Sequence, residues 1–139
     1  MSAVWTAIRL YAAVGIGSGI GAVARYLCSL GLIALLGDGF PWGTLAVNIV
    51  GSFVIGLYAT LTEPDGRIFA RATTRQFVLA GFCGGFTTFS IFSLETLRLA
   101  EAGNLTLASV NVAVSVVLWL AAVGAGFRMA QRLNRLKGA

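Results

Sequence analysis

The fold is decided by residues 84–93, Gly84-Gly85-Phe86-Thr87-Thr88-Phe89-Ser90-Ile91-Phe92-Ser93, which lie in a segment otherwise apolar enough to span a membrane. Each of two adjacent glycines costs a helix about 1 kcal/mol relative to alanine, and two β-branched threonines follow at once. The stretch therefore predicts a break in the helix near Gly84 to Thr88. Non-helical backbone inside a bilayer is tolerated only where it is buried in protein or lines a polar cavity, because its N–H and C=O groups need partners. The break therefore predicts a site in the protein interior.

Aromatic and hydroxyl side chains alternate just after the predicted break. Phe89 and Phe92 are three residues apart, so they share one helical face, and Ser90 and Ser93 lie on the adjacent face. An aromatic stripe beside a hydroxyl stripe indicates either a permeation path or a packing seam. These residues alone leave both interpretations open.

The composition places the chain in a membrane. Of its 139 residues, 58% are hydrophobic and 11% are charged, against roughly 25% charged in soluble domains. Apolar runs predict four spans at approximately 10–37, 40–62, 76–97 and 105–127, each near or above the ~20 residues that cross a bilayer as a helix. We expect an all-α integral membrane protein with one four-helix domain over residues 1–139.

The chain lacks the chemical groups that several classes of function require. The net charge of +5 comes from basic residues that flank the spans, which is typical of membrane topology rather than of nucleic-acid binding. The chain has no histidine, and Cys28 and Cys83 both fall in apolar spans, so neither a disulfide framework nor a thiolate metal site is indicated. Of the five acidic residues only Glu95 borders the interior of a span. We therefore predict that the chain is not an enzyme.

The first predicted span carries two small-residue pairs and one charge. Gly15 with Gly19, and Gly17 with Gly21, have the four-residue spacing that allows close helix packing. Arg25 interrupts the same span, where a guanidinium costs at least ~2.5 kcal/mol. It either attracts an anion into a vestibule or anchors helix ends near the interface.

The other spans contain isolated polar residues. Asn48 is the strongly polar group of the second span, and it predicts either an interhelical hydrogen bond of about 1 kcal/mol or a donor to a permeating anion. Glu95 and Arg98 have the spacing of an i, i+3 salt bridge. Asn111 and Ser115 share one face of the fourth span, as sparse polar lining or as ordinary packing.

Three segments together resemble the Fluc/CrcB fluoride channel family: residues 84–96, Trp42-Gly43-Thr44-Leu45-Ala46-Val47-Asn48 and Gly21-Ala22-Val23-Ala24-Arg25-Tyr26. The resemblance extends over all four spans in order. It implies an antiparallel dimer with two fluoride pores and a third helix that breaks near Gly84 to Thr88. It also implies that the backbone carbonyls of Gly84 and Thr87 hold a central sodium ion, which is structural and not transported.

The resemblance also implies residue roles. It assigns to the pore lining Asn48, Phe89, Phe92, Asn111 and Ser115. Arg25 and Glu95 match vestibule or structural positions of the family. In the family, polar side chains of the fourth span form a track that leads toward a vestibule. The family often has tyrosine at the position of Asn111 and serine where this chain has Trp119, so the resemblance leaves undecided which residues form that track here.

The implied function is passive fluoride efflux across the cell membrane by a multi-pass channel. Neutral HF crosses lipid and ionises in the cytoplasm, and an inside-negative potential then favours anion exit by about 2.3 kcal/mol per 100 mV. The alternative is a proton-coupled small multidrug-type exporter, which needs a buried carboxylate, although the first span offers Arg25 and no acid. A third interpretation is a non-conducting assembly subunit.

The distribution of basic residues predicts the orientation. With four spans, one side of the membrane carries eight of them: Arg9, Arg67, Arg71, Arg75, Arg128, Arg132, Arg135 and Lys137. The other side carries two, Arg25 and Arg98. This bias predicts that both termini are cytoplasmic. An antiparallel pore would then need a paralogue of opposite bias, so a homodimer and a heterodimer both remain open.

Overall fold

The computed structural model describes residues 3–135, and within that range the chain forms helices and no strands. The first two helices are α1 (Ala3–Leu36) and α2 (Trp42–Leu61), and the last is α6 (Leu105–Arg135). Between them lie α3 (Ala72–Gln76), the π-helical segment η1 (Phe77–Cys83), α4 (Gly84–Phe86) and α5 (Ser90–Glu101). Segments α3 to α5 together form one span, Ala72–Glu101, so the described chain has four helical spans long and apolar enough to cross a membrane. The predicted fold class, an all-α membrane protein with four spans, is confirmed.

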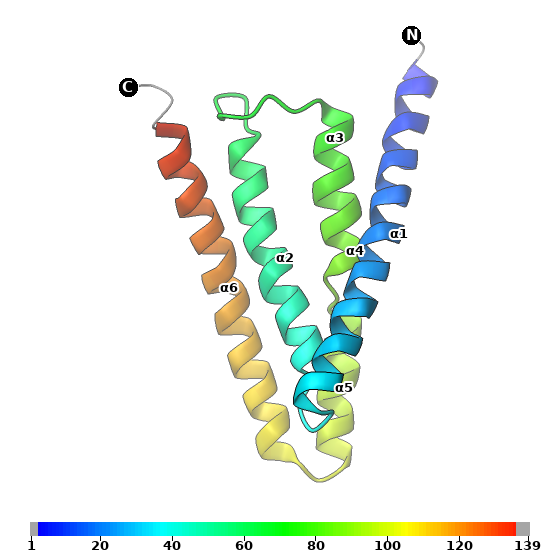
Figure 1. Ribbon diagram of the computed structural model, residues 1–139, viewed down its shortest axis with the longest axis vertical. Helices are drawn as coiled ribbons and strands as arrows, with labels where there is room; N and C mark the ends of the chain where they lie inside the picture. The colour runs from blue at the N-terminus through cyan, green and yellow to red at the C-terminus, as the bar shows by residue number, and fades with distance from the viewer. Residues whose placement is uncertain (1–2, 136–139) are drawn as a thin grey trace.

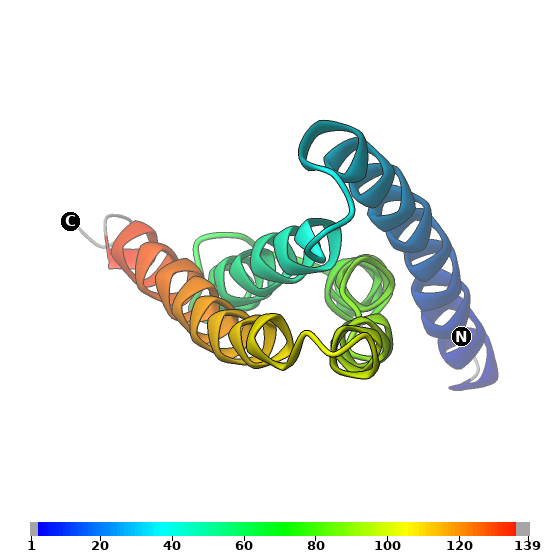
Figure 2. The same ribbon diagram turned by 90° about the horizontal axis from the view of Figure 1, so that it is seen from below.

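The spans run alternately up and down, so that the start of α1 and the end of α6 lie at the same end of the molecule (Figure 1). Both termini and the α2–α3 connection are at one end, and the α1–α2 and α5–α6 connections are at the other. Seen along the spans, α1 and α6 lie on opposite outer sides, with α2 and the third span between them (Figure 2). The principal contacts join α2 to α6 and α1 to η1.

The helices extend beyond the spans predicted from apolar runs. α1 begins at Ala3 rather than near residue 10, and α6 continues to Arg135 rather than ending near residue 127. An apolar run reports the part of a helix that lies in hydrocarbon. The helix itself continues into the interface, where long basic side chains reach water.

The third span is interrupted two residues later than the glycine pair suggests. Gly84 and Gly85 are helical, whereas residues 87–89 lie outside the helices and Thr87 is extended, with φ −88° and ψ 159°. Gly85 does not interrupt the helix but allows close packing, because a Cβ there would collide with the carbonyl oxygen of Ser18 on α1. The glycine therefore permits close packing, and the threonines carry the break.

One of the two small-residue pairs makes the close contact within the protomer. A Cβ on Gly17 would collide with the backbone carbonyl of Phe77, and one on Gly21 with that of Phe82, so α1 and η1 touch backbone to backbone. Gly15 and Gly19 have nothing within 4 Å of such a Cβ. The predicted close packing is therefore made by Gly17 and Gly21.

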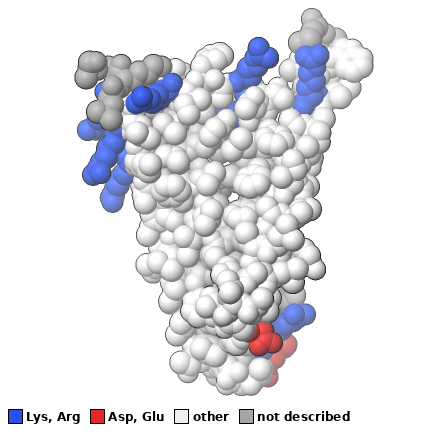
Figure 3. Space-filling model, viewed as in Figure 1, with Lys and Arg blue, Asp and Glu red and all other residues white. Residues whose placement is uncertain are grey.

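The surface and the core fit a multi-pass membrane protein. On the face seen in Figure 3, charged side chains lie near the two ends of the molecule, with an uncharged band between them. Large apolar side chains such as Tyr11, Ile20 and Val117 are exposed along that band. The fully buried side chains are few and include two polar residues: Val47, Cys83, Asn111 and Ser115. A polar group buried at membrane depth needs a hydrogen-bond partner. We therefore expect Asn111 and Ser115 to form hydrogen bonds inside the bundle.

Candidate functional site

Asn48 on α2 binds the backbone at the break in the third span. Its Nδ2 donates to the carbonyl oxygen of Thr88 at 2.8 Å, and its Oδ1 accepts from the Thr88 N–H, also at 2.8 Å. The side chain is 4% exposed. An interhelical hydrogen bond, one of the two interpretations from sequence, is therefore made. The second N–H of the same amide is still available to a ligand, because Nδ2 carries two hydrogens.

Several carbonyl oxygens lose their helical donors at the break, among them those of Gly84 and Thr87. In a continuous helix the N–H of Thr88 would donate to Gly84 and that of Ile91 to Thr87. Instead, the Thr88 N–H donates to Asn48, and the Ile91 N–H donates to Thr88 Oγ1 at 3.2 Å. The carbonyls of Gly84 and Thr87, the two predicted sodium ligands, are therefore among those released.

Thr88 has a structural role at the break that the sequence analysis did not assign to it. Its hydroxyl accepts from the N–H of Ile91 in the first turn of α5, although Thr88 itself lies one residue before the N-cap, Phe89. A threonine just before an apolar helical run is a common capping signal. That signal could have identified Thr88 as the start of the second half of the span.

A cavity of about 360 Å³ lies beside the break. It is lined by Asn48, Ser52, Ile55, Gly84, Thr87, Thr88, Phe89 and Trp119. The structure thus brings together the predicted pore asparagine, the predicted sodium ligands and one of the two predicted pore phenylalanines. Residues from α2, the third span and α6 all contribute, so the cavity exists only in the folded bundle.

The aromatic side chains form a short series across the break. The rings of Phe89 and Phe92 are 5.6 Å apart, and Phe92 meets Trp119 edge-on at 4.9 Å with an interplanar angle of 73°. Phe89 is 71% exposed, whereas Phe92 is 6% exposed. The two phenylalanines therefore differ: Phe92 packs inside the protomer, and Phe89 lies on its surface.

Asn111 and Ser115 belong to a chain of hydrogen bonds that ends at Phe92. Ser115 Oγ donates to Asn111 Oδ1 at 3.4 Å, and Asn111 Nδ2 donates to Thr96 Oγ1 at 2.8 Å. The Thr96 hydroxyl in turn donates to the carbonyl of Phe92 at 2.8 Å. These contacts join α6 to α5, and they place the two predicted pore residues next to a predicted pore phenylalanine.

Arg25 contacts the backbone just before the break. Its Nε donates to the carbonyl oxygen of Gly85 at 3.1 Å. Of the two interpretations from sequence, the structural anchor fits this contact directly, because a charged donor on a backbone carbonyl satisfies both groups inside the span. The contact also places the positive charge of Arg25 close to the break, so the second interpretation, attraction of an anion, remains open.

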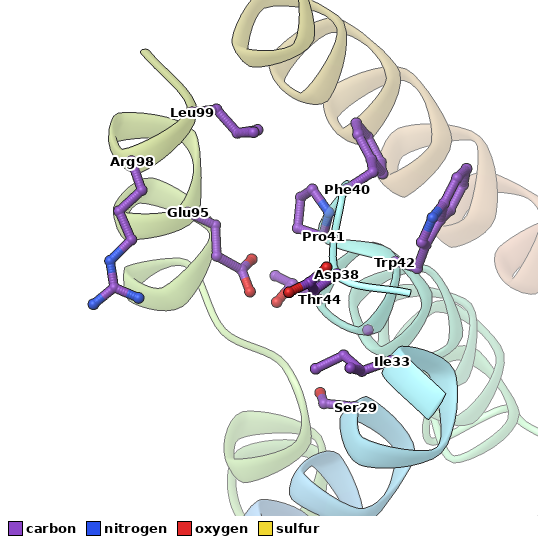
Figure 4. A pocket seen from close by; sticks show the side chains of 11 residues that line it. Ser29, Ile33, Asp38, Phe40, Pro41, Trp42, Thr44, Glu95, Arg98 and Leu99 are labelled. Carbon is purple, nitrogen blue, oxygen red and sulfur yellow. The ribbon is translucent and has the colours of Figure 1, made fainter. Parts of the chain in front are cut away.

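Glu95 faces a second cavity, of about 300 Å³, near the end of the molecule where α1 joins α2 (Figure 4). The carboxylate points into the cavity toward Thr44 and Asp38, and Arg98 also lines the cavity, but its guanidinium group points away from that carboxylate. Glu95 Oε2 is buried and has no hydrogen-bond partner among the described residues. The simple Glu95–Arg98 salt bridge predicted from spacing is therefore not the arrangement seen, because the fold turns the two side chains in different directions.

Four helical spans, with a cavity beside the break in the third span, define a polytopic membrane protein with a candidate intramembrane site. A family profile described as CrcB-like protein, Camphor Resistance (CrcB), matches residues 12–127. The chain belongs to this family, as its resemblance to Fluc/CrcB sequences predicted.

Relatives are similar over nearly the whole chain. Fluoride-specific ion channel FluC 1 of Rhodopseudomonas palustris (strain BisB18) is 55% identical over 129 residues, 93% of this chain and 92% of the relative. Fluoride-specific ion channel FluC 1 of Bradyrhizobium diazoefficiens is 55% identical over 133 residues, 96% of this chain and 92% of the relative. Fluoride-specific ion channel FluC of Opitutus terrae is 52% identical over 132 residues, 94% of this chain and 99% of the relative. These relatives are ion channels, so the prediction that the chain is not an enzyme is confirmed.

Proposed function

We propose that the chain is a fluoride-specific ion channel of the cell membrane that lowers cytoplasmic fluoride by passive efflux. The observation that carries the proposal is the cavity at the break, where the amide of Asn48, the ring of Phe89 and the released carbonyls of residues 84 and 87 meet. The relatives are named fluoride-specific ion channels, which supports fluoride as the ion that this chain conducts.

The pore lining in this proposal consists of neutral groups: Asn48, Phe89, Phe92, Asn111 and Ser115. Amide and hydroxyl donors replace water around a small anion, and the electropositive edge of a phenyl ring adds a weak attraction. Conduction needs binding that is strong enough for entry and weak enough for release. Neutral donors meet this requirement better than a lysine would, because a full positive charge would retain the anion.

The carbonyls of Gly84 and Thr87 would hold a structural sodium ion. Hard cations prefer oxygen ligands, and both oxygens have lost their helical donors to Asn48 and Thr88. Two carbonyls are too few for a complete shell, so an equivalent pair from a second copy would complete the site. The ion would neutralise the released carbonyls at the dimer centre and would not be transported.

The partner in this proposal is a second copy in antiparallel orientation. Phe89 supports a partner at this place, because a proposed pore residue that is 71% exposed in the protomer needs a second surface to enclose the path. A paralogue of opposite topology is the alternative partner. Both termini lie at one end with most of the basic side chains (Figure 3), which favours cytoplasmic termini. Lys137, counted in that bias, lies outside the described residues.

The proton-coupled small multidrug-type exporter is the weaker candidate. Its mechanism needs a buried carboxylate in a substrate cavity, for which Glu95 is the available residue. Glu95 is away from the break, however, and the relatives are named ion channels.

Fluoride efflux from liposomes tests the proposed function. The purified protein is reconstituted, loaded with potassium fluoride, and release is followed with a fluoride electrode after valinomycin is added. We expect fast fluoride release and none of chloride under the same conditions. Equal release of both anions, or no fluoride release from correctly assembled protein with or without a copurified paralogue, would contradict the proposal.

A further inference from the structure

A groove of about 510 Å³ lies along the last turns of α6. It is lined by Ala125, Arg128, Met129, Arg132 and Leu133. Both arginines are exposed, and neither guanidinium group has a hydrogen-bond or ion-pair partner among the described residues. No acidic side chain lines the groove, and the sequence of α6 contains none. The groove therefore presents two positive charges beside three apolar side chains.

The groove crosses the level at which α6 leaves the apolar part of the membrane. The uncharged run over residues 105–127 ends just before Arg128, so Ala125 belongs to the apolar part and the arginines follow it. This end of α6 lies at the end of the molecule where α1 begins (Figure 1), and basic side chains gather there on the face seen in Figure 3. Basic residues at the end of a span lie at the level of the lipid headgroups. A ligand in this groove would therefore meet charge on one part and apolar surface on the other.

The spacing of the two arginines suits a phosphate group. Residues four apart on a helix lie on one face, with about 5–6 Å between their Cβ atoms, so Arg128 and Arg132 can both reach one phosphate. Each guanidinium group can donate two parallel N–H bonds to phosphate oxygens. A free phosphate ion would use only the arginines, whereas a phospholipid would also cover Met129, which is 47% exposed. The apolar lining therefore favours a lipid over a soluble anion.

We propose that this groove binds an anionic phospholipid, with the headgroup phosphate between Arg128 and Arg132 and an acyl chain along Ala125 and Met129. A zwitterionic headgroup would bind less well, because its cationic amine offsets the charge that the arginines attract. The groove shares no lining residue with the cavity at the break, so the proposal does not depend on which ion the protein conducts. The bound lipid would hold the end of α6 at the level of the headgroups.

Native mass spectrometry of the purified protein in detergent tests the proposal. The protein is titrated with dioleoyl phosphatidylglycerol and, in parallel, with dioleoyl phosphatidylcholine. We expect the first phosphatidylglycerol to bind about fivefold more weakly to each of Arg128→Gln and Arg132→Gln, and about 25-fold more weakly to the double variant.

The matched control is Arg71→Gln, because Arg71 is exposed in the α2–α3 connection and lies outside the groove. It loses the same charge at the same end of the molecule, and it should bind the first phosphatidylglycerol as the wild type does. Equal affinity of the wild type and the double variant for phosphatidylglycerol would overturn the proposal. Equal affinity of the wild type for the two lipids would overturn it as well.

Three further measurements identify the occupant of the groove. Ala125→Trp keeps both arginines but fills the apolar part of the groove, so it should also weaken phosphatidylglycerol binding. Inorganic phosphate, added at constant ionic strength, should not displace the lipid. Size-exclusion chromatography should show the same oligomeric state for the wild type and the double arginine variant. Normal binding by Ala125→Trp, displacement by phosphate, or dissociation of the double variant, which would place a second copy in the groove, would each contradict the proposal.

Discussion

Asn48 and Thr88 are joined by two hydrogen bonds of 2.8 Å, so that one amide side chain of α2 satisfies both backbone groups of a single residue at the break. This pairing explains how an interrupted span remains stable at membrane depth. The same pairing diverts the Thr88 N–H from Gly84 and so leaves the Gly84 carbonyl, a proposed sodium ligand, without its helical donor. One contact thus connects the stability of the break with its proposed chemistry.

Asn48→Leu should therefore reduce both stability and flux. Leucine has similar bulk, but it leaves the Thr88 N–H and carbonyl unpaired, which costs about 1–3 kcal/mol for each group. We expect a clear fall in the thermal stability of the purified protein and a loss of fluoride efflux from liposomes. If flux persists while stability falls, Asn48 is a structural clamp and not part of the pore.

Phe89→Ala and Phe92→Ala should both abolish fluoride flux, but they should differ in stability. Phe92 is 6% exposed and contacts Trp119, so its truncation should cost about 3–5 kcal/mol. Phe89 is 71% exposed, so its truncation should change the stability of the protomer by less than about 0.5 kcal/mol. The measurements are thermal unfolding, size-exclusion chromatography and efflux.

The control for the phenylalanine pair is Phe69→Ala, because Phe69 is 95% exposed in the α2–α3 connection and away from the break. It should leave flux unchanged. Normal efflux from Phe89→Ala at normal dimer yield would show that the exposed ring has only a packing role.

Gly21→Ala should destabilise the protein, whereas Gly19→Ala should not. A Cβ on Gly21 would collide with the carbonyl of Phe82, and the two helices would have to separate. A Cβ on Gly19 meets nothing within 4 Å, so the change should be neutral or slightly stabilising through helix propensity. Thermal unfolding of both variants is the measurement. Equal stability of the two would contradict the packing described for α1 and η1.

Sodium removal should weaken the protein if Gly84 and Thr87 hold the ion. Exhaustive exchange of sodium for N-methylglucamine leaves two carbonyls without a donor or a cation, so we expect lower thermal stability and reduced fluoride efflux. Readdition of sodium should restore both. Full activity and stability in the exchanged protein would exclude a structural sodium ion at this site.

The sequence predicted the spans well because apolar length depends only on the local chain, and it predicted a break because threonines and glycines weaken a helix locally. The predicted break near Gly84 to Thr88 overlaps the interruption at residues 87–89, but the sequence could not show that Gly85 also packs against Ser18, a contact that appears only in the folded bundle. The partner of Asn48 could not be predicted for the same reason. Spacing suggested a Glu95–Arg98 pair, but in the structure Glu95 points toward Thr44 and Asp38, in a cavity that α5 forms together with α1, α2 and their connection.

The current through a planar bilayer under ionic gradients tests the proposed passive, fluoride-selective pathway most directly. With fluoride unequal across the membrane, we predict a current that reverses at the equilibrium potential of fluoride, and that stays there when a chloride gradient or a pH gradient is added. A reversal potential that moves with the chloride gradient would contradict selectivity, and one that moves with the pH gradient would show proton coupling instead of a passive channel.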